Sequence, residues 1–177
     1  MKKRFGFTRL PLELRRGFTL IELIVVIAVL AVLAVIIFIA LDPAMRIHQS
    51  RNACRWSDVT DIIEAVKTYE ADTGNLPDSI DTASDSVQVI GEGLGTCTSV
   101  VCPGQTVIGT NCAVSDFDTV LRAYIKKPPT DPQNGTDNDT RYYINRDIYG
   151  IITVGACDSE GEDAGGTGTA PSIAVSQ

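Results

Sequence analysis

The chain has 177 residues, a mass of 19.0 kDa and a formal net charge of -7, which suits one small domain. The charge is unevenly spread, because residues 1–17 hold six basic residues and one acidic residue, a charge of +5, and the remaining 160 residues carry -12. Residues 23–41 form an uninterrupted apolar run long enough to span about 28 Å of hydrocarbon. This run excludes a free cytosolic enzyme, and the acidic remainder argues against direct nucleic-acid binding, which needs clustered Lys and Arg.

The basic residues around the apolar run predict its orientation in a membrane. Six of them precede the run, and three follow it within a comparable distance: Arg46, Arg51 and Arg55. The positive-inside rule therefore puts the amino terminus in the cytoplasm and most of the chain outside. A cleavable secretory signal is disfavoured, because the apolar run exceeds 7 to 15 residues and residues 41–44 do not resemble a small-residue cleavage site.

A specific pattern joins the basic leader to the apolar run. Residues 15–22 read RRGFTLIE. Together with the apolar run, this stretch resembles the class III signal of type IV prepilins and type II secretion pseudopilins. In that family a prepilin peptidase cuts after the glycine and methylates the new amino terminus. The resemblance implies cleavage between Gly17 and Phe18, removal of residues 1–17 as a leader, and N-methylation of Phe18.

Glu22 is an acidic residue directly before the apolar run. A carboxylate inside a spanning segment costs about 2.5 to 3.5 kcal/mol at the centre and less near the interface, so it calls for a cation or a proton. Cleavage would create an amine at Phe18, four residues away. That amine could neutralise Glu22 within one helix, or it could meet Glu22 of the next subunit, an arrangement that the family favours in some filaments. We expect Glu22 to act in assembly.

The residues after the apolar run predict a helix break followed by a second helix. Asp42 is a good N-cap and Pro43 suits a first helical position, so a break or kink is expected there. Apolar residues then keep helical spacing until Gly74, a C-cap residue. The chain is thus expected to have a membrane or filament-core helix at 18–41 and an amphipathic helix at 42–74. Cys54, within the second helix, is expected to be an unpaired and packed thiol.

The remaining residues predict a small head, and the resemblance implies a pilin-like α+β fold for the chain as a whole. In residues 75–157 we expect strands at 87–90 and 105–108, a short helix opening at 115–118, and a hairpin of 141–145 with 148–154. These strands would form an antiparallel sheet of three or four strands packed on the long helix. Residues 158–177 are rich in Gly, Ser, Thr and acids, so we expect a flexible tail, whose residues 173–175 could pair with a neighbouring head.

The five cysteines lie in the exported part, where an oxidising compartment favours disulfides over metal thiolates. We expect Cys97 to pair with Cys102 and Cys112 with Cys157, although the sequence leaves the other pairings open.

An acidic cluster follows the last predicted strand. Major pseudopilins, which the order of residues 124–150 also resembles, hold calcium in their terminal loop. The resemblance offers four oxygen ligands at a comparable place: Asp158, Glu160, Glu162 and Asp163. The same acids fit a solvated tail, and no calcium motif of fixed spacing is present. We therefore expect no cofactor, with calcium as the alternative.

These features favour a structural subunit over an enzyme. We expect a type IV pilin that is first a single-pass protein of the inner membrane and then part of an extracellular pilus. Its partners would be prepilin peptidase, the inner-membrane assembly machinery and other pilin subunits. A type II secretion pseudopilin is the alternative, and a membrane-anchored binding protein or enzyme is a third. The residues supply no catalytic constellation, since His48 is remote in sequence from Ser115 and the acids are dispersed.

Overall fold

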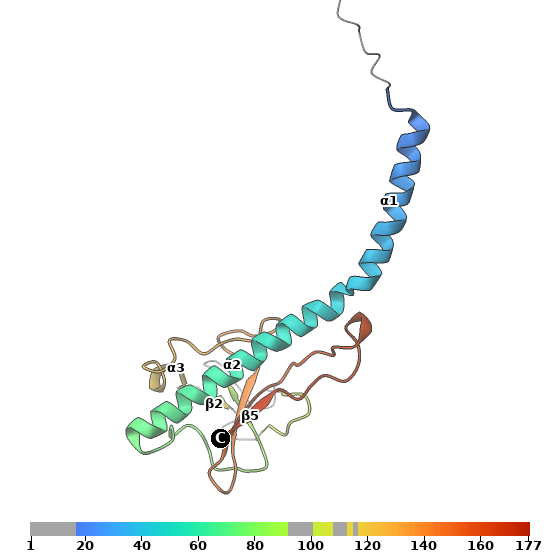
Figure 1. Cartoon of the computed structure of the whole chain (residues 1–177). Coiled ribbons are helices and arrows are strands. Elements are labelled where there is room, and N and C mark those ends of the chain that lie inside the picture. Colours follow the sequence, from blue (N-terminus) through green and yellow to red (C-terminus); the bar gives the residue numbers. More distant parts are fainter. Residues whose placement is uncertain (1–16, 92–100, 108–112, 115–116) are drawn as a thin grey trace, which may run out of the picture. The chain divides into compact units, whose positions relative to one another are not determined.

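A computed structural model describes residues 17–91, 101–107, 113–114 and 117–177 (Figure 1). The chain divides between Leu41 and Asp42 into two compact units, which are described in turn. The first contains helix α1, and the second, residues 42–177, is called the globular unit below.

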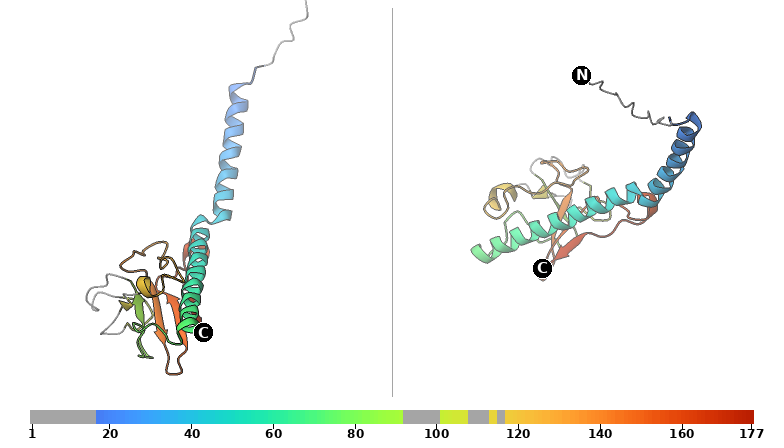
Figure 2. Two further views of the ribbon diagram at one scale, coloured as in Figure 1. Left: turned by 90° about the vertical axis from the view of Figure 1, so that its left-hand side faces the viewer. Right: turned by 45° about the horizontal axis from the view of Figure 1, so that its top comes forward.

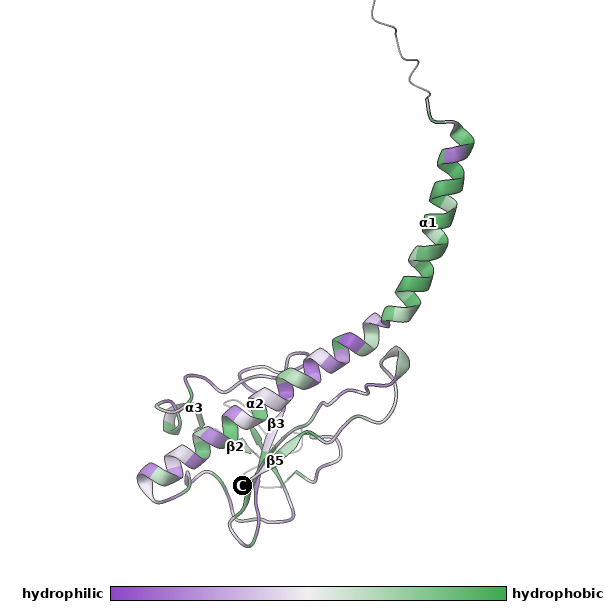
Figure 3. Ribbon diagram, in the orientation of Figure 1, coloured by the Kyte–Doolittle hydropathy of each residue, from purple (hydrophilic) through white to green (hydrophobic). Residues whose placement is uncertain are grey.

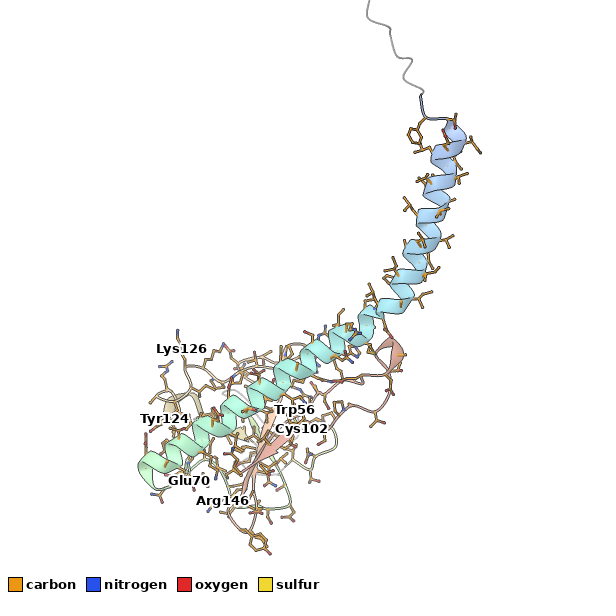
Figure 4. The ribbon with its side chains drawn as sticks, in the orientation of Figure 1. Trp56, Glu70, Cys102, Tyr124, Lys126 and Arg146 are labelled. Atoms are coloured by element: carbon orange, nitrogen blue, oxygen red, sulfur yellow. A yellow bond between two sulfur atoms is a disulfide. The ribbon has the colours of Figure 1, made fainter. Side chains whose placement is uncertain are left out.

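Helix α1 spans Leu20–Leu41 and buries none of its side chains. Figure 3 shows that α1 is apolar except for a hydrophilic stretch near its start, and Figure 4 shows side chains projecting from it on all sides. Among the described residues, the helical stretch Leu20–Thr73 is the only one with an apolar window suited to crossing a membrane, and this window lies near the amino terminus. A helix that is apolar all round requires lipid or neighbouring helices around it.

The break between α1 and α2 lies at Asp42. Its backbone is left-handed, with φ 42° and ψ 71°, and its Oδ1 accepts a hydrogen bond from the backbone N–H of Met45 at 3.3 Å. Pro43, which has no N–H to donate, is the first residue of α2. Helix α2 spans Pro43–Thr73 and ends at Gly74, whose φ of 77° suits a residue without Cβ and whose N–H donates to the Glu70 carbonyl.

The globular unit is built on one five-stranded sheet with the order β2-β1-β3-β4-β5. Its strands are β1 (Gln88–Ile90), β2 (Ala113–Val114), β3 (Tyr142–Arg146), β4 (Ile152–Ala156) and β5 (Ala174–Ser176). The predicted α+β class is confirmed, but the sheet is mixed and has five strands, because β1 pairs in parallel with β2 and antiparallel with β3. Of the strand expected at 105–108, Val107 forms an isolated parallel bridge with Val87, and residue 108 lies outside the described residues.

The two faces of the sheet are covered by different elements. Helix α2 packs on one face, where Val59, Ile62, Ile63 and Val66 are fully buried against side chains of β1, β3 and β4 (Figure 2). The short helix α3 (Phe117–Val120) completes this core with the residue that follows it, Leu121. Residues 115–116, where we expected the cap of α3, lie outside the described residues.

A smaller cluster covers the other face of the sheet. Its members come from β1, β3, the end of β4 and the loop that precedes Val107: Val87, Val89, Cys102, Tyr143 and Cys157.

The structure corrects the flexible tail expected at residues 158–177. Strand β5 pairs antiparallel with β4 of the same chain, and Ile173, only 2% exposed, belongs to the core. Two acids of this segment pair with arginines from other parts of the chain, Asp158 with Arg141 at 2.6 Å and Glu160 with Arg55 of α2 at 2.9 Å. Composition alone does not reveal such pairs, because acidic residues among glycines are typical of a solvent-exposed, flexible segment.

The structure also corrects the expected disulfides. Cys102 is bonded to Cys157, so neither of the expected pairings holds (Figure 4). Cys157 directly follows β4, and the residues around Cys102 lie against the same face of the sheet. The two Cα atoms are therefore 4.8 Å apart. Cys97 and Cys112 lie outside the described residues.

Cys54 is free, as expected, but it is exposed and not packed. The phase of α2 turns the neighbouring Asn52 and Arg55 inward, to exposures of 1% and 0%, and leaves Cys54 on the solvent side.

We predict that Cys102→Ser lowers the free energy of unfolding by about 2–4 kcal/mol, because the bond closes a loop with a sequence separation of 55. Denaturant unfolding followed by the fluorescence of Trp56, the one tryptophan, measures this loss. Cys54→Ser is the matched control and should leave the midpoint unchanged. A disulfide between Cys97 and Cys102 in a non-reducing peptide map would contradict the assignment.

Candidate assembly site

The predicted processing site lies just before α1. Gly17 and Phe18 precede the first helical residue, Leu20, outside regular secondary structure, and both are exposed, Phe18 to 85%. A peptidase needs an accessible and non-helical peptide bond, and the bond between these two residues has both properties. The basic residues of the leader lie outside the described residues.

Glu22 belongs to a capping box with Thr19. The Thr19 backbone N–H and its hydroxyl both donate to Glu22 Oε2 at 2.8 Å, and the Glu22 backbone N–H lies 3.3 Å from Thr19 Oγ1. Thr19 is thus the N-cap of α1 and Glu22 its third residue, which is the reciprocal arrangement of a capping box. Before processing, the Glu22 carboxylate is engaged by its own helix end.

The role of Thr19 as a helix cap was not predicted from the sequence. The signal was present, since Thr19 and Glu22 fit the spacing [ST]-x-x-[DE] directly before an apolar run. Cleavage after Gly17 would leave this box intact and would place a new amine one residue before the N-cap. The carboxylate could then exchange a neutral donor for a charged one.

We predict that Thr19→Ala weakens the first turn of α1 by about 1 kcal/mol, because it removes the N-cap oxygen. Amide hydrogen exchange of residues 20–24 in the detergent-solubilised chain should become faster. Thr19→Ser keeps the hydroxyl and should exchange like the wild type. Equal exchange in the Ala and Ser variants would show that the cap contributes nothing.

A second polar constellation lies within the globular unit and is centred on Arg55. Its guanidinium is fully buried and donates through Nε and Nη2 to both oxygens of Asp131, at 2.6 and 3.2 Å. Its Nη1 donates to Glu160 Oε2 at 2.9 Å and to Asn52 Oδ1 at 2.8 Å. Arg55 therefore joins α2 to the loop before β3 and to the segment after β4.

Asp131 is held in its charged form. Burial raises the pKa of its carboxyl, but hydrogen bonds from Arg55 and from the backbone N–H groups of Asn134 and Gln133 outweigh burial and bring the pKa below its usual value. The stabilisation from this pair is therefore present above the pKa of an unfolded Asp. It is lost as the pH falls through the lowered pKa of the folded state.

A third polar contact joins α2 to β3. The Tyr142 hydroxyl donates to Asp58 Oδ2 at 2.6 Å. Burial raises the pKa of the Asp58 carboxyl, and this hydrogen bond opposes the shift.

Three of the four acids considered for calcium have separate protein partners. Asp158 binds Arg141, Glu160 binds the arginines of α2, and Glu162 accepts a hydrogen bond from Asn52 at 2.7 Å. Within the ranges that the structure describes, no three His, Cys, Asp or Glu side chains are placed to hold a metal ion. Calcium stays a prediction of the resemblance. His48, the one histidine, contacts the Gly161 carbonyl and Glu160.

We predict that Asp131→Asn destabilises the chain by about 3 kcal/mol at neutral pH, because it leaves a buried guanidinium with one carboxylate fewer. The gap between wild type and variant should narrow as the pH falls through the lowered pKa of Asp131, since the wild type then loses the same charge. Denaturant midpoints across pH measure both effects.

The matched control is Asp137→Asn. Asp137 forms an exposed ion pair with Lys127, and its loss should change stability by no more than about 0.5 kcal/mol. Equal stability of the two variants at pH 7 would contradict the role of the buried pair.

Comparison with known families agrees with the amino-terminal geometry. Residues 14–38 match the prokaryotic N-terminal methylation motif, which is the class III signal of type IV pilins and pseudopilins. The match includes Gly17, Phe18, Thr19 and Glu22 together with most of α1, and it does not extend into the globular unit. Neither the curated proteins nor the solved structures yielded a match.

Proposed function

We propose that this chain, which carries the amino-terminal signal of type IV pilins and pseudopilins, is a structural subunit of a type IV pilus. The observation that carries the proposal is the methylation motif at the start of a helix with no charged residue between Glu22 and Asp42 and no buried side chain. Such a helix requires lipid before assembly and neighbouring helices afterwards.

The steps follow from the order of the residues. The precursor spans the inner membrane once with its amino terminus in the cytoplasm, and prepilin peptidase removes residues 1–17 and methylates Phe18. The inner-membrane assembly machinery then transfers α1 from lipid into a bundle of α1 helices from other subunits. In that bundle the new amine of one subunit meets Glu22 of its neighbour, and an isolated subunit lacks this contact.

A pseudopilin of type II secretion is the second candidate, since it shares the motif and the apolar helix. We place the pilus first because two of the four acids offered as calcium ligands are here engaged by arginines, Asp158 by Arg141 and Glu160 by Arg51 and Arg55. Adhesion, motility and DNA uptake are uses known in the family, and nothing in this chain selects among them.

We predict that Glu22→Val abolishes incorporation into filaments and leaves membrane insertion and the globular unit intact. In the precursor the carboxylate accepts hydrogen bonds from Thr19 only, whereas in the proposed filament it meets the charged amine of a neighbour. Filament yield in sheared surface material, compared with membrane content, measures this effect. Glu22→Asp keeps the charge and should retain part of the yield. Thr19→Ala keeps the Glu22 charge and removes the cap, so its filament yield distinguishes the effect of the charge from the effect of capping. A normal yield from Glu22→Val would contradict the proposal.

Electron microscopy of sheared surface material, with mass spectrometry of the amino-terminal peptide, tests the proposal directly. Long fibres of a chain that begins with methylated Phe18 are the expected result. Short periplasmic assemblies would favour the pseudopilin. Dispersed monomers that retain residues 1–17 would overturn both.

A further inference from the structure

The two halves of α2 contact the rest of the globular unit in different ways. From Val59 onward, α2 is held by buried apolar side chains. Between Pro43 and Cys54 it buries only one residue, Asn52, which is polar. The first half of α2 therefore contributes no side chain to the apolar core.

The polar contacts of this first half converge on one loop. Asp42 Oδ2 accepts a hydrogen bond from the Gly165 N–H at 2.6 Å. His48 Nδ1 lies 2.9 Å from the Gly161 carbonyl, and its Nε2 lies 3.3 Å from Glu160. One turn further on, Arg51 and Asn52 also bind this loop. Arg51 Nη1 donates to Glu160 Oε1 at 2.9 Å, and Asn52 Nδ2 donates to the Glu160 carbonyl and to Glu162 Oε1, both at 2.7 Å.

The loop is fixed at its two ends and polar in between. It begins after Cys157, which is bonded to Cys102, and it ends before the buried Ile173. No residue from 158 to 172 is buried. In Figures 1 and 2 this red segment runs beside the first turns of α2. Gly166, with φ 70°, lies so close to His48 that a Cβ would come within 2.7 Å of the imidazole.

We propose that residues 160–166 form a polar clasp that can open, releasing the first half of α2 (Pro43–Cys54) while the rest of the globular unit stays folded. Opening removes no apolar side chain from the core, because neither the clasp nor the half-helix contributes one. It exchanges hydrogen bonds and ion pairs for contacts with water, and it uncovers the Nη1 side of Arg55, whose bonds to Glu160 and Asn52 open. Because no apolar side chain leaves the core, this costs far less than unfolding the whole globular unit. The buried pair of Arg55 with Asp131 stays closed and marks the boundary of the opening segment.

The clasp lies wholly within residues 42–177 and would open in the same way in a pilus subunit or in a pseudopilin. It gives the segment directly after α1 its own local equilibrium. That equilibrium is set by Glu160, which binds His48, Arg51 and Arg55 at once.

Amide hydrogen exchange of the full chain in detergent micelles tests the clasp, with residues 45–54 and 59–73 of α2 followed separately. In the wild type, residues 45–54 should exchange faster than residues 59–73. Glu160→Gln weakens the clasp through its charge, and Gly166→Ala weakens it through contact with His48 and a strained backbone. Each should speed exchange of residues 45–54 at least about tenfold, as expected for the loss of one charge-assisted hydrogen bond, and leave residues 59–73 unchanged.

The matched control is Glu70→Gln, which removes the ion pair with Lys67 from the second half of α2. It should leave the exchange of residues 45–54 unchanged. Two results would overturn the proposal. In one, both halves of α2 exchange faster together in the clasp variants, which would make the globular unit a single cooperative structure. In the other, neither half responds to Glu160→Gln or to Gly166→Ala.

Discussion

A helix that is apolar on every side cannot rest in water, and this constraint on α1 governs the rest of the chain. At each stage α1 must have lipid or other helices around it, so the globular unit must fold without help from it. The division of the chain at Asp42 meets this requirement, since residues 42–177 contain the whole sheet and the whole apolar core. The acidic side chain at the start of α1 and the left-handed Asp42 at its end mark the limits of the apolar segment.

The globular unit contains a buried polar centre in addition to its apolar core. Arg55 brings together α2, the loop that contains Asp131 and the segment that contains Glu160, and these are separated by 76 and 105 residues in the sequence. Desolvating a guanidinium is costly, and its two carboxylates and Asn52 offset that cost in full only when all three segments are in place. The polar centre around Arg55 therefore helps to specify that these three segments pack together, in addition to any net stability that it supplies.

The sequence predicted the features that local patterns encode. These are the processing signal, the end of α2 at Gly74 and the hairpin of β3 and β4, because capping and alternation depend on near neighbours. It did not predict the parallel partner of β1, the pairing of β5 with β4 of the same chain or the Cys102–Cys157 bond, since these depend on which distant segments meet. Only part of the assembly site was predicted. Glu22 was identified through its charge. The capping pattern was recognised at residues 115–118 but not at Thr19 and Glu22, where it also occurs.

The surroundings of the disulfide determine how it responds to reductants. Cys102 and Cys157 are 2% and 5% exposed and lie in a cluster with the Tyr143 ring. Thiol exchange needs direct access to a sulfur atom, so a reductant has to wait until this face of the sheet opens locally. The rate of this local opening therefore limits how fast the disulfide is reduced outside an oxidising compartment. A chain released into reducing surroundings would keep the bond for as long as this face of the sheet stays closed.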